Sequence, residues 1–265
     1  MAIEGNDYGH NDLVAFAEDL RFLDAWGYEI QPLHALVDAW LTAPETLENR
    51  RLVALTCDDG SDFDARDLPH PVAGMQRSIL GHLREFRARH PERQTGLHVT
   101  SFVIVSREAR DQLDKACMVG RHWWNDDWWA EAIASGLMGI ANHSWDHNHD
   151  LLSGLPRPDC KHGDFASVDR EEVAEFEIGA ASERLRRDAP GPSARLFAYP
   201  YGETNPFLLE EYFPQHAKRI QVDAAFTTVA EPWTNASSRW TLPRYVFRRD
   251  WSTPRELKQL LDAAG

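Results

Sequence analysis

The 265-residue sequence predicts a single α/β domain in which a parallel sheet closes into a barrel. Strand-like apolar segments alternate with helical patterns along the chain, and this is the order that a parallel sheet requires. About six or seven such units recur, which favours closure of the sheet. We find no internal repeat and no linker long enough to divide the chain, so one domain is expected to span residues 1–265.

The N-terminal part predicts two helices before the first long strand. A possible cap at Asn11 precedes a helical apolar pattern that stops at Gly27. The apolar positions of this pattern are Leu13, Phe16, Leu20 and Leu23. A short apolar stretch at 28–30 and a second helical pattern at 33–41 follow. The mostly apolar run at 51–57 is typical of a strand that is buried on both faces.

The rest of the chain repeats this alternation. Further strands are predicted at 97–105, 137–141, 195–199, 224–228 and 241–247. Further helices are predicted at 107–118, 127–135 and 169–187. The last helix begins at Thr253-Pro254-Arg255-Glu256, which supplies a capping hydroxyl, a first-turn proline and a glutamate at the third position. The segment 156–163 is the most loop-like stretch.

Composition and charge narrow the classes of partner. The chain has 28 Lys and Arg against 42 Asp and Glu, a formal charge of −14, and no basic block, so nucleic acid is not expected as a partner. No apolar run is long enough for a bilayer span, and residues 1–10 do not resemble a secretory signal, so we expect a cytoplasmic protein. Cys57, Cys117 and Cys160 are widely spaced and odd in number, which predicts free thiols.

Clusters of polar residues follow three of the predicted strands. They are Asp58-Asp59-Gly60, His143-Ser144-Trp145-Asp146-His147 and Tyr199-Pro200-Tyr201-Gly202. Enzymes built on parallel sheets place their sites at these carboxyl ends of the strands. Taken alone, each cluster also fits a plain structural interpretation, namely an acidic turn, a pair of surface or core histidines, and a proline–glycine turn.

The first cluster is expected at a break in a strand, and the second has the spacing of a two-histidine metal site. Two adjacent aspartates on a regular strand would face opposite sides, so they are expected where the strand breaks, and Gly60 allows that bend. Histidines four residues apart lie on one side of a helical turn, so His143 and His147 can reach one ion. His149 is a third candidate, although two residues beyond His147 it points elsewhere on such a turn.

The order of the three motifs is more specific than any one of them. Thr56-Cys57-Asp58-Asp59-Gly60, then His143 to His147, then Tyr199 to Gly202, each after a strand, resembles the polysaccharide deacetylases of carbohydrate esterase family four. The resemblance spans roughly residues 51–245, with residues 1 to about 50 as an N-terminal helical elaboration. It implies a distorted (β/α)7 barrel, a seven-stranded relative of the eightfold α/β barrel.

The resemblance implies a role for each motif residue. Asp58 would be the general base, and the backbone amide of Tyr201 would bind the oxyanion. Asp59, His143 and His147 would hold a divalent metal ion. One carboxylate and two imidazoles leave positions open for water and substrate, as hydrolytic metal sites need. Zn²⁺ is favoured, and Co²⁺, Ni²⁺, Fe²⁺ or Mn²⁺ would suit the same ligands.

The implied activity is hydrolysis of the acetamide of an N-acetylated sugar or glycoconjugate to acetate and a free amine. Trp145, Tyr199 and Pro200 are predicted to contact this substrate, with Trp145 as a wall of the acetyl pocket. The cluster Trp123, Trp124, Trp128 and Trp129 is expected to divide between the core and sugar stacking. Cys57 is predicted to be a buried packing residue and not a nucleophile.

The sequence departs from the family pattern in two places. Ala198 stands where an arginine is expected, and no Leu-x-His near the C-terminus supplies the usual proton donor. The segment 241–245 together with Tyr-Pro-Tyr-Gly resembles the branch that acts on exopolysaccharide N-acetylglucosamine. We predict that Arg244 takes the place of the missing arginine beside Asp58. The proton donor stays open between the metal-bound water and a histidine such as His149.

Two alternative functions stay open. The same metal site would also suit hydrolysis of another C–N bond in a non-sugar substrate. A barrel that keeps the metal without catalysis would bind chitooligosaccharides and not turn them over, as Ala198 and the missing histidine would allow. The sequence makes no prediction of the physiological acceptor, the chain-length preference or the oligomeric state.

Overall fold

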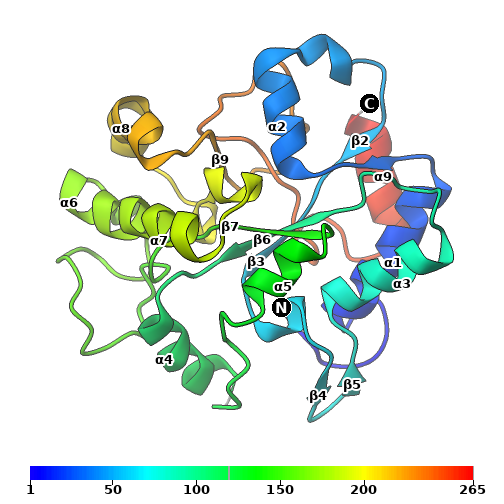
Figure 1. The fold of residues 1–265 in the computed structure, drawn as a ribbon, viewed down its shortest axis with the longest axis horizontal. Coiled ribbons are helices and arrows are strands. Elements are labelled where there is room, and N and C mark those ends of the chain that lie inside the picture. Colours follow the sequence, from blue (N-terminus) through cyan, green and yellow to red (C-terminus); the bar gives the residue numbers. More distant parts are fainter. Residues whose placement is uncertain (119, 265) are drawn as a thin grey trace.

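The computed structural model describes residues 1–118 and 120–264, and a five-stranded parallel sheet forms the centre of this part of the chain (Figure 1). The strand order is β3-β6-β7-β8-β9, and every neighbouring pair is parallel. The strands are β3 (Leu55–Asp59), β6 (Val99–Val103), β7 (Met138–Asn142), β8 (Leu196–Ala198) and β9 (Ala224–Phe226). The predicted parallel sheet is confirmed.

Short pairings continue the sheet at both edges. At one edge β1 (Glu29–Ile30) pairs in parallel with β2 (Leu52–Val53), which leads directly into β3. At the other edge Leu242 forms a parallel bridge with Phe226 of β9. The sheet therefore curls into a half-barrel surrounded by helices, which confirms the predicted class of distorted α/β barrel.

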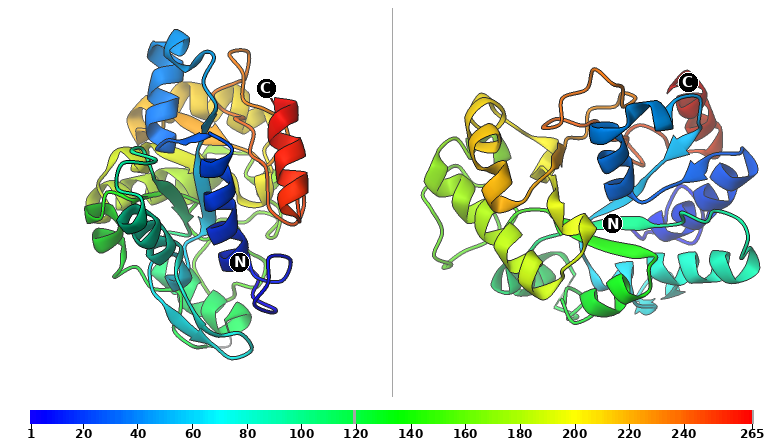
Figure 2. Two further views of the ribbon diagram at one scale, coloured as in Figure 1. Left: turned by 90° about the vertical axis from the view of Figure 1, so that its right-hand side faces the viewer. Right: turned by 45° about the horizontal axis from the view of Figure 1, so that its top comes forward.

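Helices cover the outside of the sheet. They are α1 (Asp12–Ala25), α2 (Leu33–Thr42), α3 (Ile79–Arg89), α4 (Arg107–Cys117), α5 (Trp129–Ala134), α6 (Glu171–Ala174), α7 (Ala180–Asp188), α8 (Phe213–Ile220) and α9 (Pro254–Ala264). The C-terminal α9 lies beside α1, with the Lys258 ammonium 5.8 Å from the ring centroid of Trp26 (Figure 1, Figure 2). The first and last helices of the chain thus pack together on one flank.

The predicted caps are present at the first and last helices. The Asn11 side chain accepts hydrogen bonds from the backbone of Leu13 at 3.0 Å and of Val14 at 3.3 Å. The Thr253 hydroxyl accepts from the backbone of Glu256 at 3.2 Å. Caps are local interactions, which is why the sequence locates these helix ends well.

Other elements differ from the prediction. The helix expected at 169–187 is interrupted by a π-helical turn, Glu175–Gly179, between α6 and α7. The strand expected at 241–247 is irregular beyond the bridge at Leu242, because Pro243 has no N–H to donate to a ladder. Helices α3 and α8 were not predicted, nor was an antiparallel hairpin of β4 (Leu68–His70) with β5 (Gly74–Gln76).

Apolar side chains fill both faces of the sheet. Alternate residues of a strand point to opposite faces, so Phe102 of β6 packs with Leu33 and Val37 of α2, whereas its neighbour Val103 packs in the cluster that contains α1 and α3. This two-sided burial leaves the carboxyl ends of the strands as the place where polar side chains gather. None of the described helices combines the length and the apolar character needed to cross a lipid bilayer.

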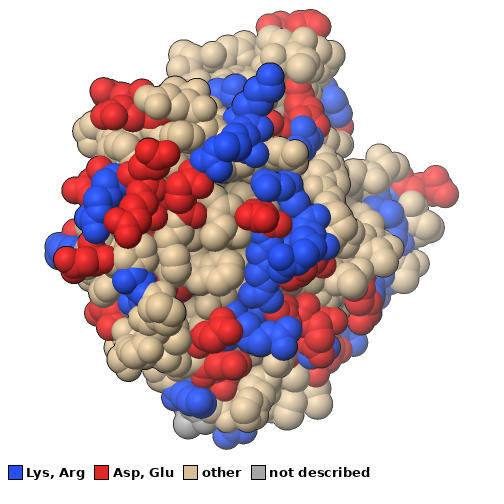
Figure 3. Space-filling view, turned by 60° about the vertical axis from the view of Figure 1, so that its left-hand side comes forward, with Lys and Arg blue, Asp and Glu red and all other residues tan. Residues whose placement is uncertain are grey.

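Charges of both signs are mixed on the surface. Figure 3 shows basic side chains that form a band bordered by acidic ones on the face it presents. With the formal charge of −14, this band is not a continuous basic surface of the kind that tracks a phosphate backbone. The expectation that nucleic acid is not a partner stays a prediction.

Candidate metal centre and catalytic site

Three potential metal ligands converge from the ends of two strands. Asp59 ends β3, and His143 and His147 follow β7. The Asp59 Oδ1 atom lies 3.6 Å from Nε2 of His143 and 3.7 Å from Nε2 of His147. Within the described residues, these three form a group whose ligand atoms all lie within 4.8 Å of one another.

The backbone bends sharply at the first motif. Asp59 and Gly60 both have left-handed conformations, with φ of 75° and 76°. A Cβ atom at residue 60 would lie 2.5 Å from Cγ1 of Val103, so only glycine fits. The break in the strand brings the carboxylates of Asp58 and Asp59 to the same histidine, His143, at 3.9 and 3.6 Å.

The donor set fits a divalent metal ion. The Nδ1 atom of His143 lies 2.8 Å from the carbonyl oxygen of Ala198, so Nδ1 donates and Nε2 faces Asp59 with a free lone pair. Burial lowers the pKa of His147 to about 3, which keeps that imidazole neutral and able to coordinate. Tetrahedral ligands at zinc bond lengths lie roughly 3.4 Å apart, close to the separations seen here.

Arg244 binds Asp58 in a bidentate ion pair. Its Nη1 lies 2.7 Å from Oδ1 and its Nη2 lies 2.9 Å from Oδ2 of the carboxylate. The guanidinium also donates to Thr56 Oγ1 at 3.3 Å and to the carbonyl oxygen of Thr227 at 3.2 Å. Burial works to raise the pKa of Asp58, but Arg244, together with the neighbouring His143 and His147, outweighs it and the pKa falls to about 2. The contact predicted from the sequence is present.

Tyr201 lies at the rim beside the histidines. It follows β8 in a left-handed conformation, with φ of 58° and ψ of 2°, and its side chain is 43% exposed. Its ring centroid is 4.5 Å from that of His147, in an edge-to-face arrangement. The ring of His149 is 5.8 Å from His147 and 6.5 Å from Tyr201, so a further titratable side chain borders the same place.

The residues predicted to contact substrate differ in how deeply they are buried. Tyr199 is fully buried, and its hydroxyl donates to the carbonyl oxygen of Trp240 at 2.9 Å. Pro200 is buried as well. Neither side chain is exposed at the rim as Tyr201 is, and their contact with substrate stays a prediction. Trp145 is half-buried, packs against the core and lies 6.1 Å from the ring of Phe176. Its role as a wall of the acetyl pocket stays a prediction.

The tryptophan cluster mostly serves the core. Trp124, Trp128 and Trp129 are buried. The indole N–H of Trp124 donates to the carbonyl oxygen of Asp59 at 2.9 Å, a support of this candidate ligand that was not predicted from the sequence. A tryptophan next to acidic residues carries no local signal for this contact, because the two residues are 65 positions apart.

Cys57 has the environment of a packing residue. Its side chain packs against the core, and its Sγ lies 3.4 Å from Oδ2 of Asp64. Burial and that carboxylate raise the pKa of the thiol well above its ordinary value, so it is a poor nucleophile. All three cysteines are free, as predicted.

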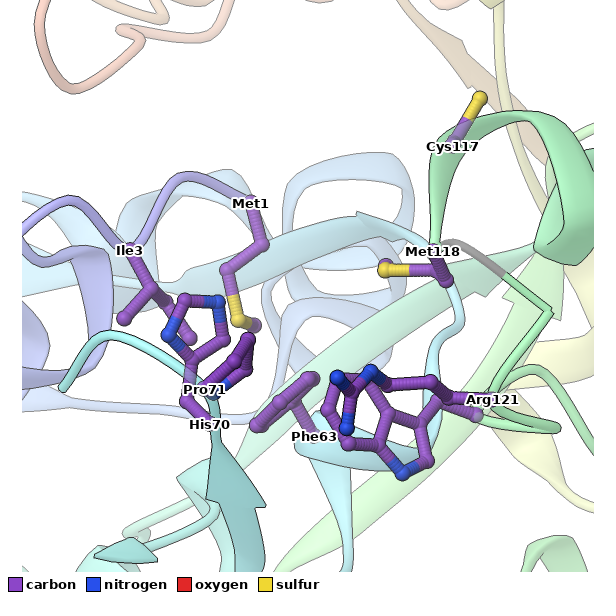
Figure 4. Close-up of a pocket in the computed structure, with 9 residues that line it drawn as sticks. Met1, Ile3, Phe63, His70, Pro71, Cys117, Met118 and Arg121 are labelled. Carbon is purple, nitrogen blue, oxygen red and sulfur yellow. The ribbon is translucent and has the colours of Figure 1, made fainter. Parts of the chain in front are cut away.

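A cavity lies between the N-terminus, Phe63 and the segment 117–123. It has a volume of about 150 Å³ and is lined in part by Phe63 and Trp123, together with Met1, Met118 and Arg121 (Figure 4). Phe63 follows Asp59 by four residues, and Trp123 precedes the tryptophan that binds the Asp59 carbonyl. The cavity is therefore lined by residues next in sequence to the first motif and to Trp124, and by none of the three grouped residues Asp59, His143 and His147.

Comparison with solved structures identifies proteins of the same fold. A deacetylase named PplD from Streptococcus pyogenes, in complex with acetate, has a TM-score of 0.61 and 18% identity, covering 94% of this chain and 86% of that one. IcaB from Ammonifex degensii has a TM-score of 0.59 and 20% identity, with 96% and 90% covered. A de-N-acetylase from Aggregatibacter actinomycetemcomitans has a TM-score of 0.62 and 14% identity, with 98% of each chain covered.

Comparison of the sequence with models of protein families shows the family to which the chain belongs. No curated protein matches the sequence. The family model described as polysaccharide deacetylase matches residues 47–213, a range that includes Asp58, Asp59, both histidines of the second motif and Tyr201. This range is more than half of the chain. The chain therefore belongs to the polysaccharide deacetylase family.

Proposed function

We propose that this polysaccharide deacetylase holds a divalent metal ion on Asp59, His143 and His147 and hydrolyses the acetamide of an N-acetylated sugar or glycoconjugate to acetate and a free amine. The observation that carries the proposal is the convergence of one carboxylate and two imidazoles beside a second, arginine-paired carboxylate. The acetate-bound deacetylase and the de-N-acetylase among the structural neighbours support the acetamide as the target. Zinc is the proposed ion because its preferred ligands are of these types.

Each polar group of the site has a task in this reaction. A divalent ion bound there polarises the acetamide carbonyl and acidifies water. The Asp58 carboxylate accepts a proton from the attacking water, and Arg244 keeps that carboxylate ionised and oriented. The backbone amide of Tyr201 is proposed to stabilise the oxyanion, supported by its left-handed turn beside His147.

The leaving amine needs a proton when the C–N bond breaks. His149 is our candidate donor, because its ring borders both His147 and Tyr201. Its side chain is 22% exposed, so it can exchange protons with solvent.

The direct test is metal analysis of the purified protein, combined with acetate release from N-acetylglucosamine oligomers. We expect about one divalent ion per chain and acetate in equal amount to new free amine. Release of ammonia or another amine from a panel of non-sugar amides, with no acetate from the sugars, would favour the alternative C–N hydrolase. Binding of the oligomers with no acetate would show a carbohydrate-binding protein that lacks catalysis.

Arg244→Ala is expected to move the acid limb of the pH profile of kcat/KM to higher pH. The base works when it is ionised, so activity falls as the pH drops through the pKa of Asp58. Arg244 helps to hold that pKa at about 2, and without the cation burial raises it, so activity is lost at a higher pH, by roughly 1–3 pH units. Metal content should not change.

Arg249→Ala is the matched control, because Arg249 lies on the same segment but pairs with Asp250. Its pH profile is expected to equal that of the wild type. An Arg244→Ala variant with an unchanged acid limb would show that Arg244 does not tune the base.

A further inference from the structure

A buried ion pair is built into the turn that carries the two histidine ligands. Asp146 immediately precedes His147, and Arg157 comes from the loop that follows this turn. The Arg157 Nε lies 2.7 Å from Oδ2 of Asp146, and its Nη2 lies 3.1 Å from Oδ1. The two side chains are only 6% and 1% exposed, so this is not a solvated surface pair.

The same guanidinium reaches both sides of His147. Its Nη1 donates to the carbonyl oxygen of His149 at 3.0 Å, and its Nη2 also lies 3.4 Å from Oδ1 of Asn148. One side chain thus joins the residue before His147 to the two residues after it. A planar group with five donors can make these contacts together, whereas a single ammonium cannot.

The opposite side of the turn is held by the π-helical turn Glu175–Gly179. A π-helical turn disturbs the regular helical hydrogen bonds and so makes carbonyl groups available for other partners. Here the carbonyl oxygen of Glu177 accepts from the backbone of Trp145 at 2.7 Å, and that of Ile178 accepts from the side chain of Asn142 at 3.2 Å. The Glu177 carboxylate also accepts from the backbone of Asp146 at 3.3 Å.

The turn needs external support because its backbone is strained. Ser144, His147 and Asn148 have φ of 70°, 66° and 44°, in the left-handed region that residues other than glycine adopt at a cost. Such conformations persist only where the surrounding structure holds them. The orientation of the His147 ring depends on this backbone, so its supports bear on metal coordination.

We propose that Arg157 is a positioning residue for the metal site, which ties Asp146 to Asn148 and His149 across the turn so that His147 faces Asp59. This inference rests on the proposed function, since it assigns a purpose to a contact of the same metal site. Arg157 acts through Asp146 and the His149 carbonyl and does not itself touch the ligand atoms.

The test compares metal binding by the wild type, Arg157→Met and Arg157→Lys, titrated with Zn²⁺ against a chromophoric chelator. We expect about 10–100-fold weaker Zn²⁺ affinity in Arg157→Met, the usual effect of losing a partner that orients a ligand, and a smaller loss in Arg157→Lys. The absorption bands of the Co²⁺-loaded protein report ligand geometry without any turnover, and they should change in Arg157→Met.

Arg195→Met is the matched control. Arg195 bridges Asp38 at 3.1 Å and Asp223 at 2.6 Å, and it lies just before β8, at the end of that strand remote from the metal ligands. Its loss is expected to leave Zn²⁺ affinity and the Co²⁺ spectrum unchanged. Should Arg157→Met fail to fold because Asp146 is left unpaired, the double variant Arg157→Met with Asp146→Asn removes both charges and is expected to fold with the same weakened affinity.

The outcomes distinguish the positioning role of Arg157 from the proposed function. Wild-type Zn²⁺ affinity and an unchanged Co²⁺ spectrum in a folded variant that lacks Arg157 would overturn the positioning role and leave the proposed function intact. A wild-type protein that binds no divalent metal would overturn the proposed function itself, and the positioning role with it.

Discussion

His143→Ala and His147→Ala are each expected to lose bound metal and to reduce acetate release to the level of chelator-treated wild type. The chain offers three ligands to the ion, so removal of one leaves two, and both imidazoles face the same Asp59 oxygen. The fold should survive, because the hydrophobic clusters on both faces of the sheet, and not the ion, hold a chain of this size together.

Three measurements check this prediction. They are the metal content of the purified variants, acetate release at saturating substrate, and the far-UV circular dichroism spectrum, which should resemble that of the wild type. Full turnover in chelator-treated protein after verified loss of metal would show that the metal-site assignment is wrong. Loss of the folded spectrum on chelation would show that the ion is structural.

Asp58→Asn is expected to lower turnover by roughly 10²–10⁴-fold while metal stays bound, the usual size of a general acid–base contribution. An amide cannot accept the proton of the attacking water, and Asp58 is not one of the three grouped ligands. Asp59→Asn is expected to behave differently although it is the next residue. The main effect of Asp59→Asn should be a loss of metal affinity, because the Oδ1 atom of Asp59 lies close to Nε2 of both histidines.

Cys57→Ala is the matched control on the same strand, because the thiol packs against the core and its pKa is raised. It should keep metal and most of the turnover. Metal lost from Asp58→Asn and retained by Asp59→Asn would reverse the two roles. Loss of turnover in Cys57→Ala with normal folding would revive a nucleophilic thiol.

Much of the site followed from the sequence because its signals are local. Adjacent aspartates with a glycine, and histidines four residues apart, are each contained within a short segment. The prediction that the histidines share a helical turn is wrong, because Ser144 and His147 have left-handed conformations in an irregular turn. Their place at the carboxyl ends of β3 and β7 follows from the general construction of parallel sheets. The contact of Arg244 with Asp58 was predicted for a different reason, since a carboxylate left without its usual arginine needs another cation.

The burial of individual side chains was harder to predict from the sequence than the positions of the motifs. Tyr199 lies two residues from Tyr201 in the same motif, yet the first is fully buried and the second is 43% exposed. Which side of the turn meets the core depends on α8 and on Trp240, which are distant in sequence. The same holds for Trp145, whose neighbour Phe176 belongs to an interruption in a helix that the sequence pattern predicted to be regular.

The sequence by itself determined the fold class, the order of the motifs and the three metal-ligand candidates, because periodicity, caps and short motifs act within a few residues. Only the tertiary structure decided which side chains support those ligands. Trp124 binds the Asp59 carbonyl across 65 positions, and Arg157 reaches the histidine turn from the following loop. Such contacts depend on how the curved sheet and its loops pack in three dimensions, and no local pattern of residue types encodes that packing.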